Sequence, residues 1–159
     1  MKKAILLGIF ALVTSISLQA QNQETTTVSP KFEIKVITSV ESVVPLGMGR
    51  SRLISSNAEK DYKEFTSSQT EDDNSRNKSK RKDVRVKDFE ETKLLNFYNV
   101  AGIRFQNIAA NDALISSKLT QMLAEGWDLA FVTSAVESDA GKDDGNGIFI
   151  TRYIFKRKL

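Results

Sequence analysis

Three carboxylates stand close together near the end of the chain, at Asp139, Asp143 and Asp144. Glycines and one asparagine surround them between residues 137 and 147, so the backbone can turn tightly and side-chain oxygens are at hand. Calcium is bound by about six to eight oxygens of these kinds. The spacing differs from a helix-loop-helix calcium site, because Asp144 occupies the position that requires glycine and no glutamate closes the loop. The stretch is therefore either a solvated hairpin loop, which we favour, or a calcium-binding module.

Two missing residue types narrow the catalytic chemistry that this chain can perform. It contains no histidine, the commonest general base and transition-metal ligand, and no cysteine, so disulfides and thiol nucleophiles are excluded. An enzyme would have to be a small carboxylate-based hydrolase, and that chemistry needs two acids across a cleft. No feature of the sequence sets a second acid opposite the 137–147 loop. We therefore predict a protein that is not an enzyme, with no catalytic residue and no cofactor.

One principal amphipathic helix is predicted over residues 111–125. Asn111 and Asp112 are residue types that commonly cap the start of a helix, and Gly126 is typical of its end. The apolar residues between them recur at helical spacing: Leu114, Ile115, Leu119, Met122 and Leu123. Such a stripe packs against a core, so the helix should cover one face of a sheet.

Strands flank this helix on both sides in the sequence. Alternation from Trp127 to Val132 predicts a strand just past the helix, and residues 32–44 alternate in the same way. The stretch 147–157 is apolar on both faces, which is typical of an interior strand that is covered on both sides. We therefore predict an α+β fold with a mainly antiparallel sheet and one helix on one face. The C-terminal strand should be central, between the first strand and the Trp127 strand.

Three blocks of the chain carry a family resemblance. FEIKVI occupies residues 32–37, EGWDLA follows the helix at 125–130, and YIFKR closes the last strand at 153–157. These blocks resemble a small bacterial family of domains of unknown function, whose members read EYKVV, a helix, EGWELV, a short hairpin and FKR. The resemblance implies the fold and no activity. This chain differs from that pattern by a long insertion before the helix and by a longer hairpin loop.

The insertion is predicted to hold further strands and a polar loop. Residues 51–55 and 92–99 are predicted as strands that pair with each other, although part of 84–100 also fits a helical face. Residues 66–83 contain no apolar residue, so we predict a disordered loop, since such a composition cannot bury enough surface to order itself. The basic run Lys78–Lys82 lies in this loop, and we interpret it as solvated rather than as a nucleic-acid contact.

The N-terminus predicts export. Residues 1–20 read as a signal peptide: Lys2 and Lys3 precede a short apolar run, and cleavage is expected after Ala20. Residues 21–30 are polar and predict a flexible leader, followed by a single domain over 31–159. Loss of Lys2 and Lys3 lowers the 23 basic residues to 21, against 20 acidic ones, so the net charge falls to about +1. This balance gives no support to a nucleic-acid partner.

The functional hypothesis follows from these features together. We expect an exported protein, periplasmic or secreted and not anchored to a membrane, because the apolar run is too short for a comfortable span and no lipid-modified cysteine is present. We expect a non-catalytic binding or interaction module whose partner is a protein or another surface ligand. The alternatives are the small hydrolase and the calcium-binding module described above.

Overall fold

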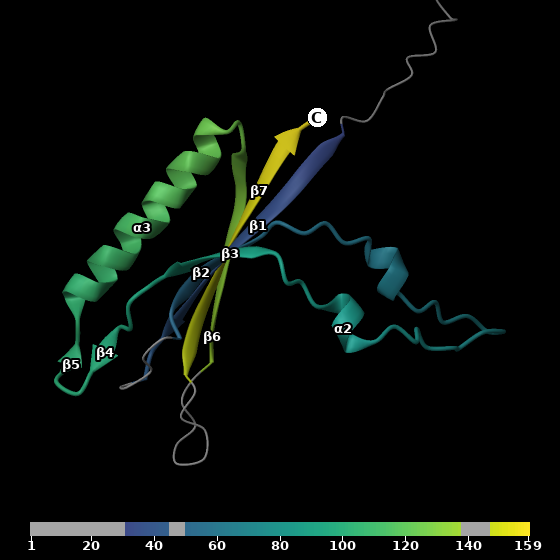
Figure 1. Ribbon diagram of the computed structural model, residues 1–159, viewed down its shortest axis with the longest axis horizontal. Helices are drawn as coiled ribbons and strands as arrows, with labels where there is room; N and C mark the ends of the chain where they lie inside the picture. Colours follow the sequence, from purple (N-terminus) through teal and green to yellow (C-terminus); the bar gives the residue numbers. More distant parts are fainter. Residues whose placement is uncertain (1–30, 45–49, 138–146) are drawn as a thin grey trace, which may run out of the picture. The chain divides into compact units, whose positions relative to one another are not determined.

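The computed structural model describes residues 31–44, 50–137 and 147–159 of the chain (Figure 1). The elements, in order, are β1(Phe32–Ser42), β2(Arg52–Ser56), the 3-10 turn η1(Tyr62–Phe65), α2(Arg81–Val84), β3(Phe89–Lys93), β4(Tyr98–Asn99), β5(Gly102–Ile103), α3(Phe105–Ala124), β6(Asp128–Glu137) and β7(Ile148–Lys158). The fold is α+β, with a mainly antiparallel sheet and one main helix, as predicted.

The main sheet has the strand order β3-β2-β1-β7-β6, and each neighbouring pair is antiparallel. β7 lies between β1 and β6, so the predicted interior position of the C-terminal strand is confirmed. β1 and β7 pair along their whole length, from Phe32 opposite Lys158 to Ser42 opposite Ile148. These two strands form the longest pairing of the sheet. The shorter β2 and β3 extend the sheet on the β1 side.

The helix α3 begins six residues earlier than predicted, at Phe105, and ends at Ala124. The assignment of Asn111 and Asp112 as its N-cap is wrong, since Arg104 holds that position without a side-chain hydrogen bond. Asn111 instead turns inward and is fully buried, because partners distant in sequence satisfy its amide. The predicted stop is correct: Gly126 has φ of 82°, a conformation that glycine adopts without strain.

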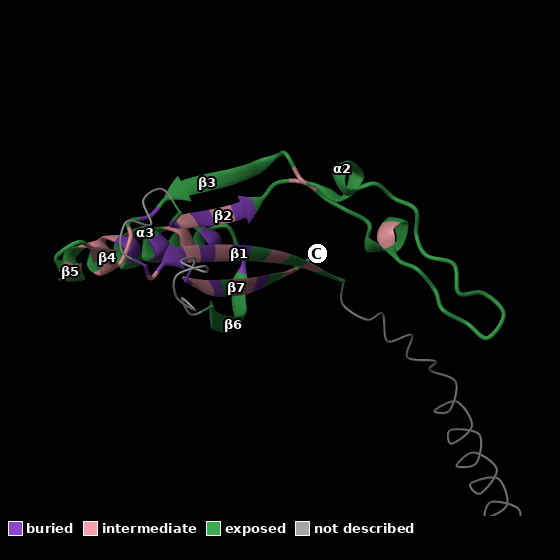
Figure 2. Ribbon diagram, turned by 90° about the horizontal axis from the view of Figure 1, so that it is seen from below, coloured by how far each residue is buried: buried purple, intermediate pink, exposed green. Residues whose placement is uncertain are grey.

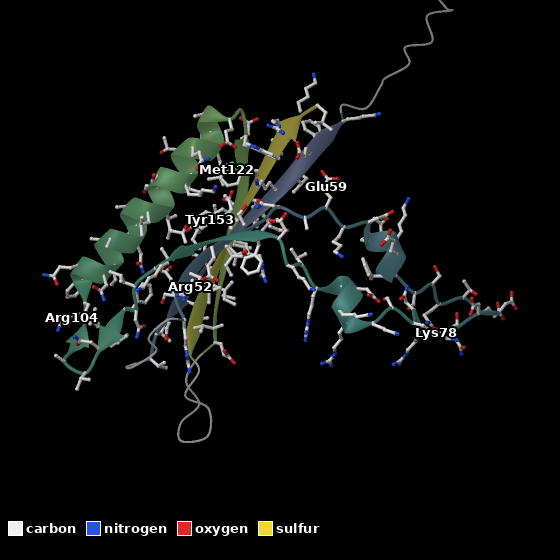
Figure 3. The ribbon with its side chains drawn as sticks, viewed as in Figure 1. Arg52, Glu59, Lys78, Arg104, Met122 and Tyr153 are labelled. Atoms are coloured by element: carbon white, nitrogen blue, oxygen red, sulfur yellow. The ribbon has the colours of Figure 1, made fainter. Side chains whose placement is uncertain are left out.

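The core lies between α3 and one face of the sheet. Ile115 and Met122 of the helix pack with Trp127 and with sheet residues that include Ile37 and Phe155. In Figure 3, Met122 and Tyr153 both lie in the space between α3 and the strands. Trp127 is only 4% exposed, and it belongs to the core cluster against which Leu119 of the helix packs.

The other face of the sheet is open, so the prediction that β7 is covered on both sides is wrong. Figure 2 shows buried and exposed bands along β1. On the side away from α3, Phe32, Ile34 and Val36 are exposed. Ile34 is 60% exposed. The physical reason is that, among the described residues, α3 is the one long helix, and a single helix covers a single face.

The insertion between β1 and α3 contributes β2, β3 and a long polar segment. β3 pairs with β2 as predicted, but it spans Phe89–Lys93 rather than 92–99. Residues 57–88 contain no buried residue and run out from the sheet and back, with Asn57 N–H donating to the Asp88 carbonyl at their base. The basic run 78–82 is exposed and leads into α2. That residues 66–83 are disordered stays a prediction.

Candidate binding surfaces

The open face of the sheet carries continuous rows of apolar side chains. Phe131 of β6, Ile154 of β7 and Val36 of β1 stand directly opposite one another across three strands. A second row joins Ala135, Ile150 and Val40 in the same order. Phe131 is 61% exposed, and the exposed Ile34 and Phe32 extend the surface along β1. Val40, Ile150 and Ile154 of the rows are half-buried, while Phe131 and Val36 are exposed, so this apolar surface is a candidate for an interaction site.

A single cation lies between these two rows. Arg152 stands opposite Thr133 on one side and Thr38 on the other, and it is exposed. Within the described part of the chain, no carboxylate forms an ion pair with it. Four residues further along β7, Lys156 lies over the ring of Phe32, with its ammonium nitrogen 5.9 Å from the ring centroid. We call the two apolar rows, Ile34, Phe32 and Arg152 together the open face.

A shallow pocket lies near Trp127, at the far end of the covered face. It has a volume of about 330 Å³ and is lined by Glu33, Ile34, Lys35, Ser56, Asn57, Ala58, Glu59, Glu125, Trp127 and Arg157. Arg157 lies over the Trp127 ring, 4.4 Å from its centroid, and its guanidinium nitrogen is 2.7 Å from a carboxylate oxygen of Glu33. Glu33 is therefore held in an ion pair with Arg157.

A polar cluster is buried between α3 and β1. The Asn111 amide nitrogen donates to a Glu41 carboxylate oxygen at 2.8 Å and to the Leu95 carbonyl at 2.8 Å, and its oxygen accepts from the Leu95 N–H at 2.7 Å. Burial raises the pKa of Glu41 above its usual value, the Asn111 hydrogen bond opposes this, and the nearby Asp112 carboxylate adds to it. Burial likewise raises the pKa of Tyr153. The cluster is enclosed, so we assign it to holding the helix on the sheet.

The three residues predicted as a metal site, Asp139, Asp143 and Asp144, lie outside the described residues. Over 31–44, 50–137 and 147–159, no group of three acids, histidines or cysteines is arranged to hold a metal ion. In the same part of the chain, no helix has both the length and the apolar character needed to cross a membrane.

Sequence reasoning missed the open face and the Asn111 cluster. The open face had a signal, because the apolar residues of β1 and β7 exceed what one helix can cover. Comparison with known proteins adds no assignment: no family model, no curated protein and no solved structure matches this chain. The resemblance to the bacterial family stays a prediction.

Proposed function

We propose that this protein is an exported, non-catalytic binding module and that its partner docks on the open face. The observation that supports this is a sheet face on which Ile34 and Phe131 are exposed around Arg152, which forms no ion pair within residues 31–44, 50–137 and 147–159. Aromatic residues and arginine are the types that concentrate in the cores of protein interfaces, and they supply much of the binding energy there.

The chemistry of the open face defines the partner. A planar guanidinium gives up its hydration more readily than an ammonium group and can bond a carboxylate with two parallel hydrogen bonds. Arg152 stands between two threonine hydroxyls and two apolar rows, so its best counterpart is a carboxylate within an apolar patch. We therefore expect a protein partner with an acidic side chain in an otherwise apolar surface. A phosphate backbone would leave the apolar rows exposed.

Capture from the exported fraction tests this proposal. The protein, expressed from its full-length gene, is immobilised beside the variants Arg152→Glu and Ile34→Asp, and captured proteins are identified by mass. Arg76→Glu and Val100→Asp are matched controls, because Arg76 is exposed in the polar insertion and Val100 is 85% exposed in the turn between β4 and β5.

The expected result is a partner held by the parent protein and both controls and lost by both open-face variants. Once purified, that partner should bind Arg152→Glu at least about tenfold more weakly, because truncated interface anchors commonly cost that much. The same captured proteins for all five samples would contradict the proposal. Binding to anionic vesicles alone would contradict the protein partner.

Export is the second part of the proposal, and it rests on residues 1–20. Fusion of residues 1–25 to a reporter should carry it across the membrane, with processing near Ala20. The control replaces the two lysines at positions 2 and 3 with glutamate, which should weaken export because the charged start is reversed. An unprocessed fusion in the cytoplasm would contradict the periplasmic or secreted location.

A further inference from the structure

The outer edge of β6 differs from ordinary sheet edges. β6 spans ten residues, Asp128–Glu137, and pairs with β7 alone among the described strands. The eight residues between its two terminal acids are Leu-Ala-Phe-Val-Thr-Ser-Ala-Val, with no charge and no proline. Sheet edges in soluble proteins are usually protected by charges, proline or a short length, because their unpaired N–H and C=O groups bond other strands. β6 has none of these three protections between Phe131 and Val136, and its one printed irregularity, a register shift between Leu129 and Phe131, lies near the start of the strand.

The opposite edge of the same sheet is protected. β3 is five residues long and carries Glu90, Glu91 and Lys93. Glu91 forms an ion pair with Arg52 of β2, and Glu90 forms one with Lys118 of α3. The chain therefore blocks one edge against pairing and leaves the other able to pair. This asymmetry is the reason to assign a function to the β6 edge.

Polar contacts join the helix to β3 and to the segment just after it, and β6 stays largely exposed. Lys118 bonds Glu90, Asn107 bonds the Asn96 carbonyl, and Asn111 bonds Leu95. The α3-side residues Leu129, Val132 and Val136 of β6 are exposed, and so is Leu123 of the helix. Phe131 is exposed on the other side of the strand. Apolar side chains thus lie exposed on both sides of an unpaired edge.

We propose that β6 pairs with β6 of a second copy of this chain, antiparallel and about a two-fold axis, so that two five-stranded sheets become one. Directly opposed residues of antiparallel strands share a face. Val132 stands opposite Tyr153 on the helix side and Thr133 opposite Arg152 on the open face. The axis must therefore lie at a residue opposed to its own copy, Val132 or Thr133 near the strand centre. Both α3 helices then lie on the same side.

The uncharged centre of β6 fits a second copy of this chain, because antiparallel pairing about Val132 or Thr133 sets the uncharged central residues of the two copies along each other. Lys156 of β7 stands beside the Asp128 end of β6, and Glu137 is at the other end. Antiparallel pairing brings Glu137 of each copy beside Asp128 of its partner, with Lys156 directly opposite Asp128 on the next strand, and it keeps the two copies of Glu137 apart. A two-fold axis closes the assembly at two copies, and each dimer presents two open faces on one side.

The absence of cysteine makes a crosslinking test clean. Single variants Val132→Cys, Thr133→Cys and Ser134→Cys, expressed from the full-length gene, are oxidised and compared with Val100→Cys, which lies away from β6. Two cysteines join only when their Cβ atoms come within about 4.5 Å. We expect one β6 position to crosslink far faster than its neighbours and Val100→Cys to remain monomeric. Sedimentation of the unmodified protein should give twice the monomer mass.

A second pair of variants tests how tightly the two copies bind each other. Val132→Lys places two ammonium groups beside the axis, so its dissociation constant should rise at least about tenfold, while Val100→Lys should leave it unchanged. Circular dichroism confirms that each variant is folded. A monomer at all concentrations would overturn the proposal, and so would a dimer that Val132→Lys does not weaken or that crosslinks at no β6 position. Open-ended fibres would overturn the closed two-fold form. None of these results depends on the partner of the open face.

Discussion

Replacement of Asn111 by leucine should destabilise this domain strongly, although the volume of the side chain hardly changes. The Asn111 amide satisfies three groups at once: the buried Glu41 carboxylate and the partly buried N–H and carbonyl of Leu95. Leucine has nearly the same volume and fills the site, so packing changes little. The cost comes from leaving those groups without partners.

The expected magnitude follows from that count. A buried polar group left unsatisfied costs about 1–3 kcal/mol, and a charged one costs more, so the three groups together cost about 3–6 kcal/mol. A domain of this size has a total stability of about 5–15 kcal/mol. Each kcal/mol lowers the melting temperature by about 4 °C at this length. Asn111→Leu should therefore lower the melting temperature by about 10–25 °C, with Glu41 taking up a proton as a partial compensation.

Urea unfolding followed by tryptophan fluorescence measures this, because Trp127 is the single tryptophan and is buried. Asn74→Leu is the control, since Asn74 is exposed and should change stability by less than about 0.5 kcal/mol. Asn111→Asp should be at least as damaging at neutral pH, because it sets a second carboxylate against Glu41. Adding Glu41→Gln to Asn111→Asp restores one amide and should recover part of the loss. A cost below about 1 kcal/mol for Asn111→Leu, or no recovery in the double variant, would refute the reasoning.

Three further predictions concern the core, the pH response and the acidic loop. Trp127→Ala should cost about 3–5 kcal/mol in urea unfolding, and a loss below about 1 kcal/mol would contradict its burial. Because the folded state raises the pKa of Glu41, this carboxyl contributes stability that is present at acidic pH and lost as the pH rises through its raised pKa. The melting temperature of Glu41→Gln minus that of the parent should therefore become more positive from pH 4 to pH 8. A constant difference would contradict the raised pKa. Millimolar calcium should raise the melting temperature no more than sodium chloride of equal ionic strength, whereas a calcium-specific rise lost in Asp143→Asn with Asp144→Asn would establish a calcium site.

The sequence predicted the helix, its end and the neighbours of the C-terminal strand because these depend on short-range periodicity and on Gly126. It did not predict the role of Asn111, because the residue type that caps a helix is also one that satisfies buried backbone groups. Its charged partner, Glu41, is 70 positions away in the chain. Similarly, the position of β3 was set by the register with β2, which brings Leu53 opposite Thr92. Such pairings are decided by the assembled sheet and leave no local pattern.

The exposure of the open face cannot be predicted from the apolar pattern of a single strand. β7 alternates apolar residues on both sides, and a strand with this pattern is usually buried on both. Whether it is buried depends on how many layers the chain can supply, and the described residues supply one long helix for a five-stranded sheet. Polar contacts join that helix to β3, and the apolar excess remains on the outer side of β1 and β7 and along β6. A partner on the open face and a second copy at β6 would bury this surface, which is the physical reason for proposing both contacts.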